Sequence, residues 1–147
     1  MNITTKPGNL SDLKVNIKIK LASLWAAVMC CYIYGDYFSL YVPKQIEKFI
    51  NVKTLLDAPE KLLGASILMA IPSLMIFLSI ALKASINRWL NIIFGIIYTA
   101  IMVLIATTSG GSWWMFYTFL AILESVLTLL IVWNAVKWPK QFENLKI

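Results

Sequence analysis

The sequence predicts an all-α integral membrane protein, folded as one four-helix bundle of transmembrane spans. The main evidence is a set of apolar stretches at residues 21–42, 62–82, 89–109 and 113–136. Each is at least as long as the roughly 20 apolar residues that a helix needs to cross a bilayer. Hydrophobic residues make up 60% of the 147 residues, whereas a soluble domain contains about 45–50%. These observations exclude a soluble enzyme, a disordered segment and a nucleic-acid-binding protein.

The distribution of basic residues predicts the orientation of the spans. Nine of the thirteen Lys and Arg residues lie in or beside the tails 1–20 and 139–147 and the connection between the second and third spans. The other four lie in the loop between the first two spans. Because loops rich in Lys and Arg stay in the cytoplasm, both tails are expected to be cytoplasmic. Residues 21–138 contain no internal repeat and are expected to form a single transmembrane domain.

The first span carries a ridge of small residues at every fourth position. It begins too late and runs too long for a signal peptide, so it is expected to stay in the protein. The alternating residues 15–21 before it fit either an extended arm or a juxtamembrane helix. In lipid, a ridge of small residues lets two helix backbones approach closely. We expect it to pack against another helix of this chain or of a second chain. The ridge consists of Ser23, Ala27, Cys31, Gly35 and Ser39.

The loop between the first two spans contains a predicted interfacial helix. After Pro43, the apolar residues Ile46, Phe49 and Ile50 recur at helical spacing, and polar residues fill the positions between them. A short helix with one apolar face lies in the plane of the membrane interface. This helix is therefore expected on the outer surface of the bilayer.

Further signals mark the ends of the spans. Asp57 precedes Glu60 by three residues, which predicts a capping box at the start of the second span. The connections at 83–88 and 110–112 are short, so the last three spans are expected to run antiparallel. The tryptophans fall near the span ends, as in the aromatic belts of membrane proteins. They are Trp25, Trp89, Trp133 and Trp138 towards the cytoplasm, and Trp113 and Trp114 on the outer side.

Glu124 is the residue that most needs a functional explanation. It lies at the midpoint of the fourth span, where a charged side chain costs at least about 2.5 kcal/mol. Tyr117, Ser125 and Thr128 share its helical face, which is too polar for lipid and is expected to point into the bundle.

Other polar groups reach a similar depth in the other spans. Tyr32 and Asp36 share one face of the first span, and Tyr98 lies in the middle of the third. Pro72, at the midpoint of the second span, leaves the carbonyl of Leu68 without its helical donor. The predicted ion or ligand cavity comprises Glu124, Asp36, Tyr32, Tyr98, Asn91, Thr128 and Ser73.

Two interpretations of Glu124 remain open at this point. A protonated Glu124 could bond Tyr98 or a backbone carbonyl and tie the bundle together. Such interhelical bonds average only about 0.6 kcal/mol in a membrane, and Gln or Ser would supply them at lower cost. A second acid, Asp36, in another span favours an ionisable role, because acids inside membranes commonly bind ions or relay protons.

The function class favoured by these residues is proton- or cation-linked transport, or a channel-like role, through the cavity. The alternative is a non-catalytic accessory or sensory subunit that docks on a second copy or on another membrane protein through the ridge from Ser23 to Ser39. No nucleophile–base pair can be assembled, so the chain is not expected to be an enzyme. With no histidine and only the adjacent Cys30 and Cys31, no metal site or cofactor is expected, and lipid is the expected partner.

Several short motifs occur together along the chain. They are Leu24-Trp25, Tyr32-x-Tyr34-x-Asp36, Ile71-Pro72-x-x-Met75-x-x-Leu78-Ser79, Asn87-Arg88-Trp89-x-Asn91 and Glu124-x-x-x-Thr128-x-x-Ile131-Val132-Trp133. As a set they resemble a family of small bacterial four-span membrane proteins catalogued as a domain of unknown function. The resemblance covers residues 21–138 and implies a bacterial inner-membrane location, but it supplies no activity. Small multidrug exporters place their membrane glutamate in the first span, so their function is not carried over.

Overall fold

A computed structural model describes residues 14–139 as an all-helical chain, with no strand in that range. The helices are α1 (Ile17–Ser39), α2 (Gln45–Ile50), α3 (Pro59–Ala81), α4 (Ala84–Thr108), the 3-10 helix η1 (Ser112–Trp114) and α5 (Met115–Val136). Four of them, α1, α3, α4 and α5 together with η1, are long and apolar enough to cross a membrane. Most of the predicted tails, 1–20 and 139–147, lies outside the described residues.

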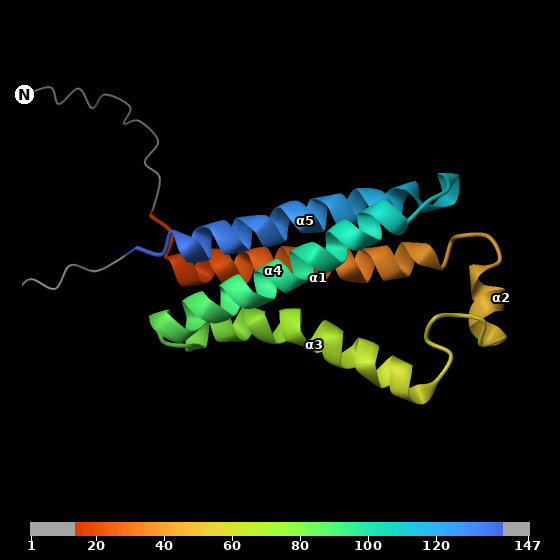
Figure 1. The fold of residues 1–147 in the computed structure, drawn as a ribbon, viewed down its shortest axis with the longest axis horizontal. Helices are drawn as coiled ribbons and strands as arrows, with labels where there is room; N and C mark the ends of the chain where they lie inside the picture. The colour runs from red at the N-terminus through yellow and green to blue at the C-terminus, as the bar shows by residue number, and fades with distance from the viewer. Residues whose placement is uncertain (1–13, 140–147) are drawn as a thin grey trace, which may run out of the picture.

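The four long helices lie side by side along one axis (Figure 1). Both ends of the described chain and the α3–α4 connection lie at one end of the bundle, which we call the termini end. The helix α2 lies at the opposite end, which we call the loop end. The last three long helices therefore run antiparallel, as predicted.

Each predicted span coincides with a helix whose ends are shifted by a few residues. α1 begins at Ile17, so most of the ambiguous segment 15–21 is helical, and the Asn16 side chain caps it by accepting a hydrogen bond from the Lys18 amide at 2.9 Å. α5 begins later than expected because residues 112–114 form a 3-10 turn.

The predicted capping box at Asp57 is wrong. α3 begins after Ala58 with Pro59 in its first turn, and no side chain caps it. A proline in the first turn of a helix removes only a donor that has no helical partner, and its φ is already helical. The Asp57 carboxylate instead forms an ion pair with Lys61 Nζ at 2.5 Å.

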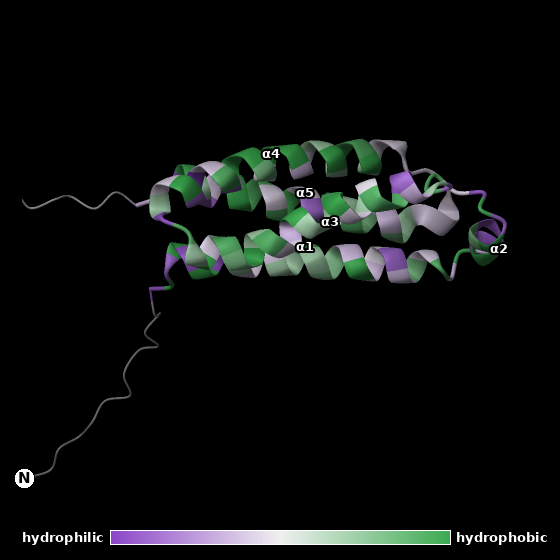
Figure 2. Ribbon diagram, turned by 90° about the horizontal axis from the view of Figure 1, so that it is seen from below, coloured by the Kyte–Doolittle hydropathy of each residue, from purple (hydrophilic) through white to green (hydrophobic). Residues whose placement is uncertain are grey.

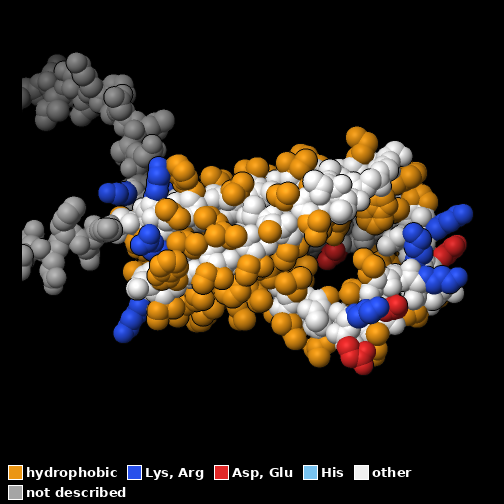
Figure 3. All heavy atoms as spheres, viewed as in Figure 1, with side chains coloured by type: hydrophobic (Ala, Val, Ile, Leu, Met, Phe, Trp, Pro, Cys, Tyr) orange, Lys and Arg blue, Asp and Glu red, His pale blue; other side chains and the backbone are white. Residues whose placement is uncertain are grey.

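Large hydrophobic side chains cover the outside of the long helices. Phe77, Leu104 and Phe119, on three different helices, are each more than 60% exposed. Figure 2 shows hydrophobic residues along most of the length of these helices. Figure 3 shows the hydrophobic surface between two ends that carry Lys and Arg. Such a continuous apolar surface is typical of side chains that face lipid.

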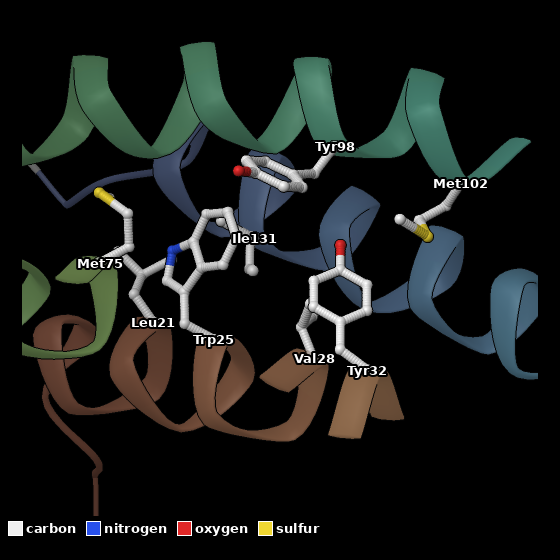
Figure 4. Packing of buried hydrophobic residues seen from close by; sticks show 8 residues of the cluster. All are labelled: Leu21, Trp25, Val28, Tyr32, Met75, Tyr98, Met102 and Ile131. Carbon is white, nitrogen blue, oxygen red and sulfur yellow. The ribbon is translucent and has the colours of Figure 1, made fainter. Parts of the chain in front are cut away.

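A cluster of buried side chains fills the interior (Figure 4). Trp25 lies at its centre with 0% exposure, and its ring packs edge-on against Tyr98 with 5.9 Å between centroids. The prediction that Trp25 belongs to the interfacial belt is wrong, because its indole N–H donates to the buried Asn91 Oδ1 at 2.8 Å. The other members of the cluster are Leu21, Val28, Tyr32, Met75, Met102 and Ile131.

The helix α3 is fixed to the bundle at the termini end and diverges from it towards the loop end (Figure 1). At the termini end, Lys18 Nζ donates to the carbonyls of Leu82 at 2.6 Å and Ile80 at 3.2 Å. A lysine satisfies the free carbonyls at a helix C-terminus in this way. Since α3 packs mainly on α1 and shares only a small interface with α4, the bundle is closed at the termini end and open towards the loop end.

Candidate functional site

A small cavity lies inside the bundle, and all four long helices contribute to its wall. Its volume is about 40 Å³, and a water molecule needs about 10–15 Å³ of such space. The cavity therefore has room for water or a small ion. Its lining residues are Tyr32, Gly35 and Asp36 from α1, Met69 from α3, Met102 and Ile105 from α4, and Tyr117, Leu120, Ala121 and Glu124 from α5.

Glu124 projects from the middle of α5 into this cavity and is only 4% exposed. Within residues 14–139 its carboxyl group forms no hydrogen bond, although its backbone carbonyl accepts one from the Thr128 hydroxyl at 2.9 Å. The bond to Tyr98 that a structural role for Glu124 could have used is absent from the same range, because the Tyr98 hydroxyl donates to the Leu68 carbonyl. Asp36 lines the same cavity, and its side chain is exposed.

Tyr32 supplies a second buried polar group without a partner. Its side chain is 7% exposed, and its hydroxyl has no hydrogen-bond partner among the described residues. Figure 4 shows this hydroxyl pointing from α1 into the space beside α4 and α5. A buried hydroxyl left unsatisfied costs about 1–3 kcal/mol, so water or a ligand in the cavity would stabilise it.

A wider groove adjoins the cavity at the loop end. Its volume is about 580 Å³, and we call it the loop-end vestibule. Asp36 and Tyr117 line both spaces, so this pair lies where the vestibule meets the cavity. Figure 3 shows a hollow between α3 and the other helices, with an acidic side chain on its wall. The remaining vestibule residues are Ser39, Gln45, Lys48, Phe49, Lys53, Thr54, Leu55, Leu56 and Trp114.

Tyr32, Asp36 and Glu124 are therefore the predicted site residues that share one cavity. Thr128 lies on the α4–α5 contact, where its hydroxyl accepts a hydrogen bond from Thr99 at 2.7 Å. Ser73 is exposed, and its hydroxyl lies 3.4 Å from the Met69 carbonyl of its own helix. Neither of these residues lines the cavity.

Asn91 belongs to a buried hydrogen-bond network nearer the termini end. Its Oδ1 accepts from Trp25, and its Nδ2 donates to the Asn87 Oδ1 at 2.6 Å. The Asn87 amide in turn donates to the Ser79 carbonyl at 2.5 Å. The network links α1, α3 and α4 and leaves no side-chain atom of these residues unpaired. A satisfied network of this kind stabilises one packing arrangement.

Tyr98 satisfies the carbonyl that Pro72 leaves free. Its hydroxyl donates to the Leu68 carbonyl at 2.5 Å, one turn before Pro72 in α3. The orphan carbonyl was expected from the proline alone, whereas its partner comes from another helix. The bond ties α4 to the middle of α3.

We expect Tyr98→Phe to lower the free energy of unfolding by about 1 kcal/mol, because it removes one interhelical hydrogen bond in a membrane and leaves the Leu68 carbonyl unsatisfied. Reversible unfolding in lipid bicelles measures this loss. In a Pro72→Ala background the amide of residue 72 can serve the carbonyl, so the loss should shrink. An equal loss in both backgrounds would contradict this role for Tyr98.

The small-residue ridge of α1 packs partly within the chain. A Cβ on Gly35 would lie 3.6 Å from side-chain atoms of Leu120 and Tyr117 on α5, an ordinary contact distance. Ser23 is exposed, and Ala27, Cys31 and Ser39 are half-buried.

The most crowded of the described glycines is one that the sequence interpretation missed. A Cβ on Gly95 of α4 would lie 2.6 Å from Val132 Cγ2 on α5. Gly95 and Thr99 are small residues four positions apart, so the same spacing rule could have identified them.

Metal ligands are not gathered at the site. Over residues 14–139 no group of three or more His, Cys, Asp or Glu side chains is placed to hold a metal ion. The cavity offers two carboxylates and two tyrosine hydroxyls, and the rest of its wall is apolar.

A family model described as a family of unknown function (DUF6326) matches residues 10–144. No curated protein and no solved structure matches the chain. The match covers all the long helices and the cavity.

Proposed function

The chain belongs to this family of unknown function, and we propose that it is a proton- or cation-linked transporter or channel-like protein that acts through the cavity around Glu124. One observation carries the proposal. Two acids on different helices and an unpartnered tyrosine hydroxyl share a water-sized cavity inside an apolar bundle. Ionisable groups inside a membrane are costly, and they commonly mark ion pathways and proton relays.

A purely structural role for Glu124 has less support. A structural acid at this depth would bond a neighbouring helix, yet the carboxyl group forms no hydrogen bond within residues 14–139. The interhelical bonds near the midplane are made by Tyr98 and Thr128 instead. The bundle is thus held together without Glu124, which leaves its carboxyl free to bind a proton or cation.

We also propose a bacterial inner-membrane location with both termini in the cytoplasm, and no enzymatic activity. The excess of Lys and Arg at the termini end supports this orientation. The helix α2 would lie on the outer interface, since its apolar residues Ile46, Phe49 and Ile50 are exposed.

An impermeant amine reagent added to intact cells should therefore label Lys53, in the loop after α2, and spare Lys83, in the α3–α4 connection. Both lysines are exposed, so accessibility within the fold does not bias the comparison. Mass spectrometry of the purified protein gives the ratio of labelling at the two lysines. Preferential labelling of Lys83 would show that the orientation is the opposite of the proposed one.

The infrared carboxylic-acid band of Glu124 in lipid tests the proposed function. We expect the difference between wild type and Glu124→Gln to change reversibly with the pH of the bath, because the cavity adjoins the vestibule. Glu60→Gln, which removes an exposed acid at the start of α3, is the control and should keep the band. A band that ignores pH, Na⁺ and K⁺ alike would mean an inaccessible structural acid and would overturn the proposal.

A further inference from the structure

We infer that in this conformation Glu124 is reached from the loop end alone, through Asp36 and Tyr117, and that the species it takes up is a proton rather than a metal cation. This inference rests on the proposed function and narrows it. Asp36 and Tyr117 are the two residues common to the cavity and the vestibule. Since Lys48 and Lys53 of the loop also line the vestibule, this side of the cavity leads to the loop end, where the apolar helices stop.

The opposite side of the cavity is closed by packed side chains. Trp25, Met75, Tyr98 and Ile131 are almost fully buried and fill the interior towards the termini end (Figure 4). Beyond them lies the satisfied network around Asn91. The described residues therefore offer no polar route from Glu124 to the termini end in this conformation.

The donor set favours a proton over a metal ion. Hard cations such as Ca²⁺ or Mg²⁺ take about six or more oxygen ligands, and the cavity wall is apolar at Met69, Met102 and Leu120. A proton needs only one carboxylate oxygen and a water molecule, so the apolar wall does not exclude it.

The groups around Glu124 form a short series from the vestibule inwards. The titratable side chains near it are Cys31, Tyr32 and Asp36 on α1 and Tyr117 on α5. On α4, the ring of Tyr98 lies beside that of Tyr32, with 6.5 Å between centroids. From α3, the residue that lines the cavity is Met69, which does not titrate. No Lys or Arg of the described chain lines the cavity, so a proton that binds Glu124 does not compete with a basic side chain there.

The transfer itself conserves charge. A proton from the vestibule first binds a carboxylate oxygen of Asp36. It then leaves that carboxyl through cavity water and forms an O–H bond on Glu124, and Asp36 returns to the carboxylate. Tyr32, whose hydroxyl has no partner among the described residues, lines the cavity that this water would occupy.

Proteoliposomes sorted by the side on which an N-terminal tag is exposed test the route. The bath pH is stepped while the interior is strongly buffered, and the Glu124 infrared band is followed in time. We expect the band to respond quickly only when the loop end faces the bath. Asp36→Asn should slow that response by at least about 100-fold, as for loss of a positioned proton-transfer group. Glu47→Gln, an exposed acid on α2, should leave it unchanged, and Tyr117→Phe serves if Asp36→Asn misfolds.

Each alternative outcome has a distinct meaning. A faster response with the termini end facing the bath would overturn the route while leaving Glu124 as the proton-binding group. A response to Na⁺ or K⁺ at constant pH would overturn the proton as the bound species. A Glu124 band that responds to neither pH nor cations in either orientation would overturn the proposed function itself.

Discussion

Glu124→Gln is expected to reduce potential-driven proton uptake into vesicles to the level of protein-free vesicles. Glutamine keeps the size of the side chain but cannot bind and release a proton in the physiological range. The fold should survive, because the carboxyl group has no hydrogen bond within the described residues to lose and a neutral amide costs less than a carboxylate at this depth. A pH-sensitive dye inside the vesicles, with the potential set by K⁺ and valinomycin, measures the uptake.

Three further variants serve as comparisons for the effect of Glu124→Gln on proton uptake. Glu47→Gln should keep the wild-type rate, since Glu47 is an exposed acid on α2 that lines neither the cavity nor the vestibule. Glu124→Asp should retain part of it, because a carboxyl remains in the cavity. Asp36→Asn should lower the rate by about 100-fold, because the proton reaches Glu124 through that carboxylate. Equal rates for wild type and Glu124→Gln would show that any flux bypasses this residue.

The part of the site that could be predicted from the sequence depends on depth and helical periodicity. Glu124 and Tyr32 fall at span midpoints, and Asp36 lies one turn from Tyr32, so all three were identified from position alone. These properties belong to single helices. The structure brings the three residues into one cavity.

The pairing between helices could not be predicted in the same way. Pro72 implies an orphan carbonyl at Leu68, but nothing in α3 says that Tyr98 will supply the donor. Tyr98 and Asn91 share a polar face of α4, yet they bond to α3 and to Trp25 rather than line the cavity. Which partner a polar face meets depends on how the helices are rotated and ordered, and a single sequence does not specify this.

The same limit applies to the small residues. The ridge through Gly35 is longer than the pair Gly95 and Thr99, so it gave the stronger signal. In the structure the closer approach is at Gly95, where α4 meets α5. Small residues permit close packing, but the neighbouring helix decides whether it occurs.

Gly95→Ala is accordingly expected to lower the free energy of unfolding by about 2 kcal/mol, in the usual range for an overpacked interior. The new methyl group would lie 2.6 Å from Val132 Cγ2, and a valine side chain has little freedom to rotate away in a helix. Gly64→Ala, where nothing lies within 4 Å, should be neutral or stabilising by up to about 1 kcal/mol. Reversible unfolding in bicelles measures both changes.

A double-mutant cycle separates this clash from a general effect of alanine. Val132→Ala removes the methyl group that the new Cβ would meet, so Gly95→Ala should cost much less in that background. Gly35→Ala should be tolerated in either background, because its nearest neighbours stand at 3.6 Å. If Gly35→Ala were the more damaging substitution and Val132→Ala gave no relief, the closest helix contact would lie along the α1 ridge.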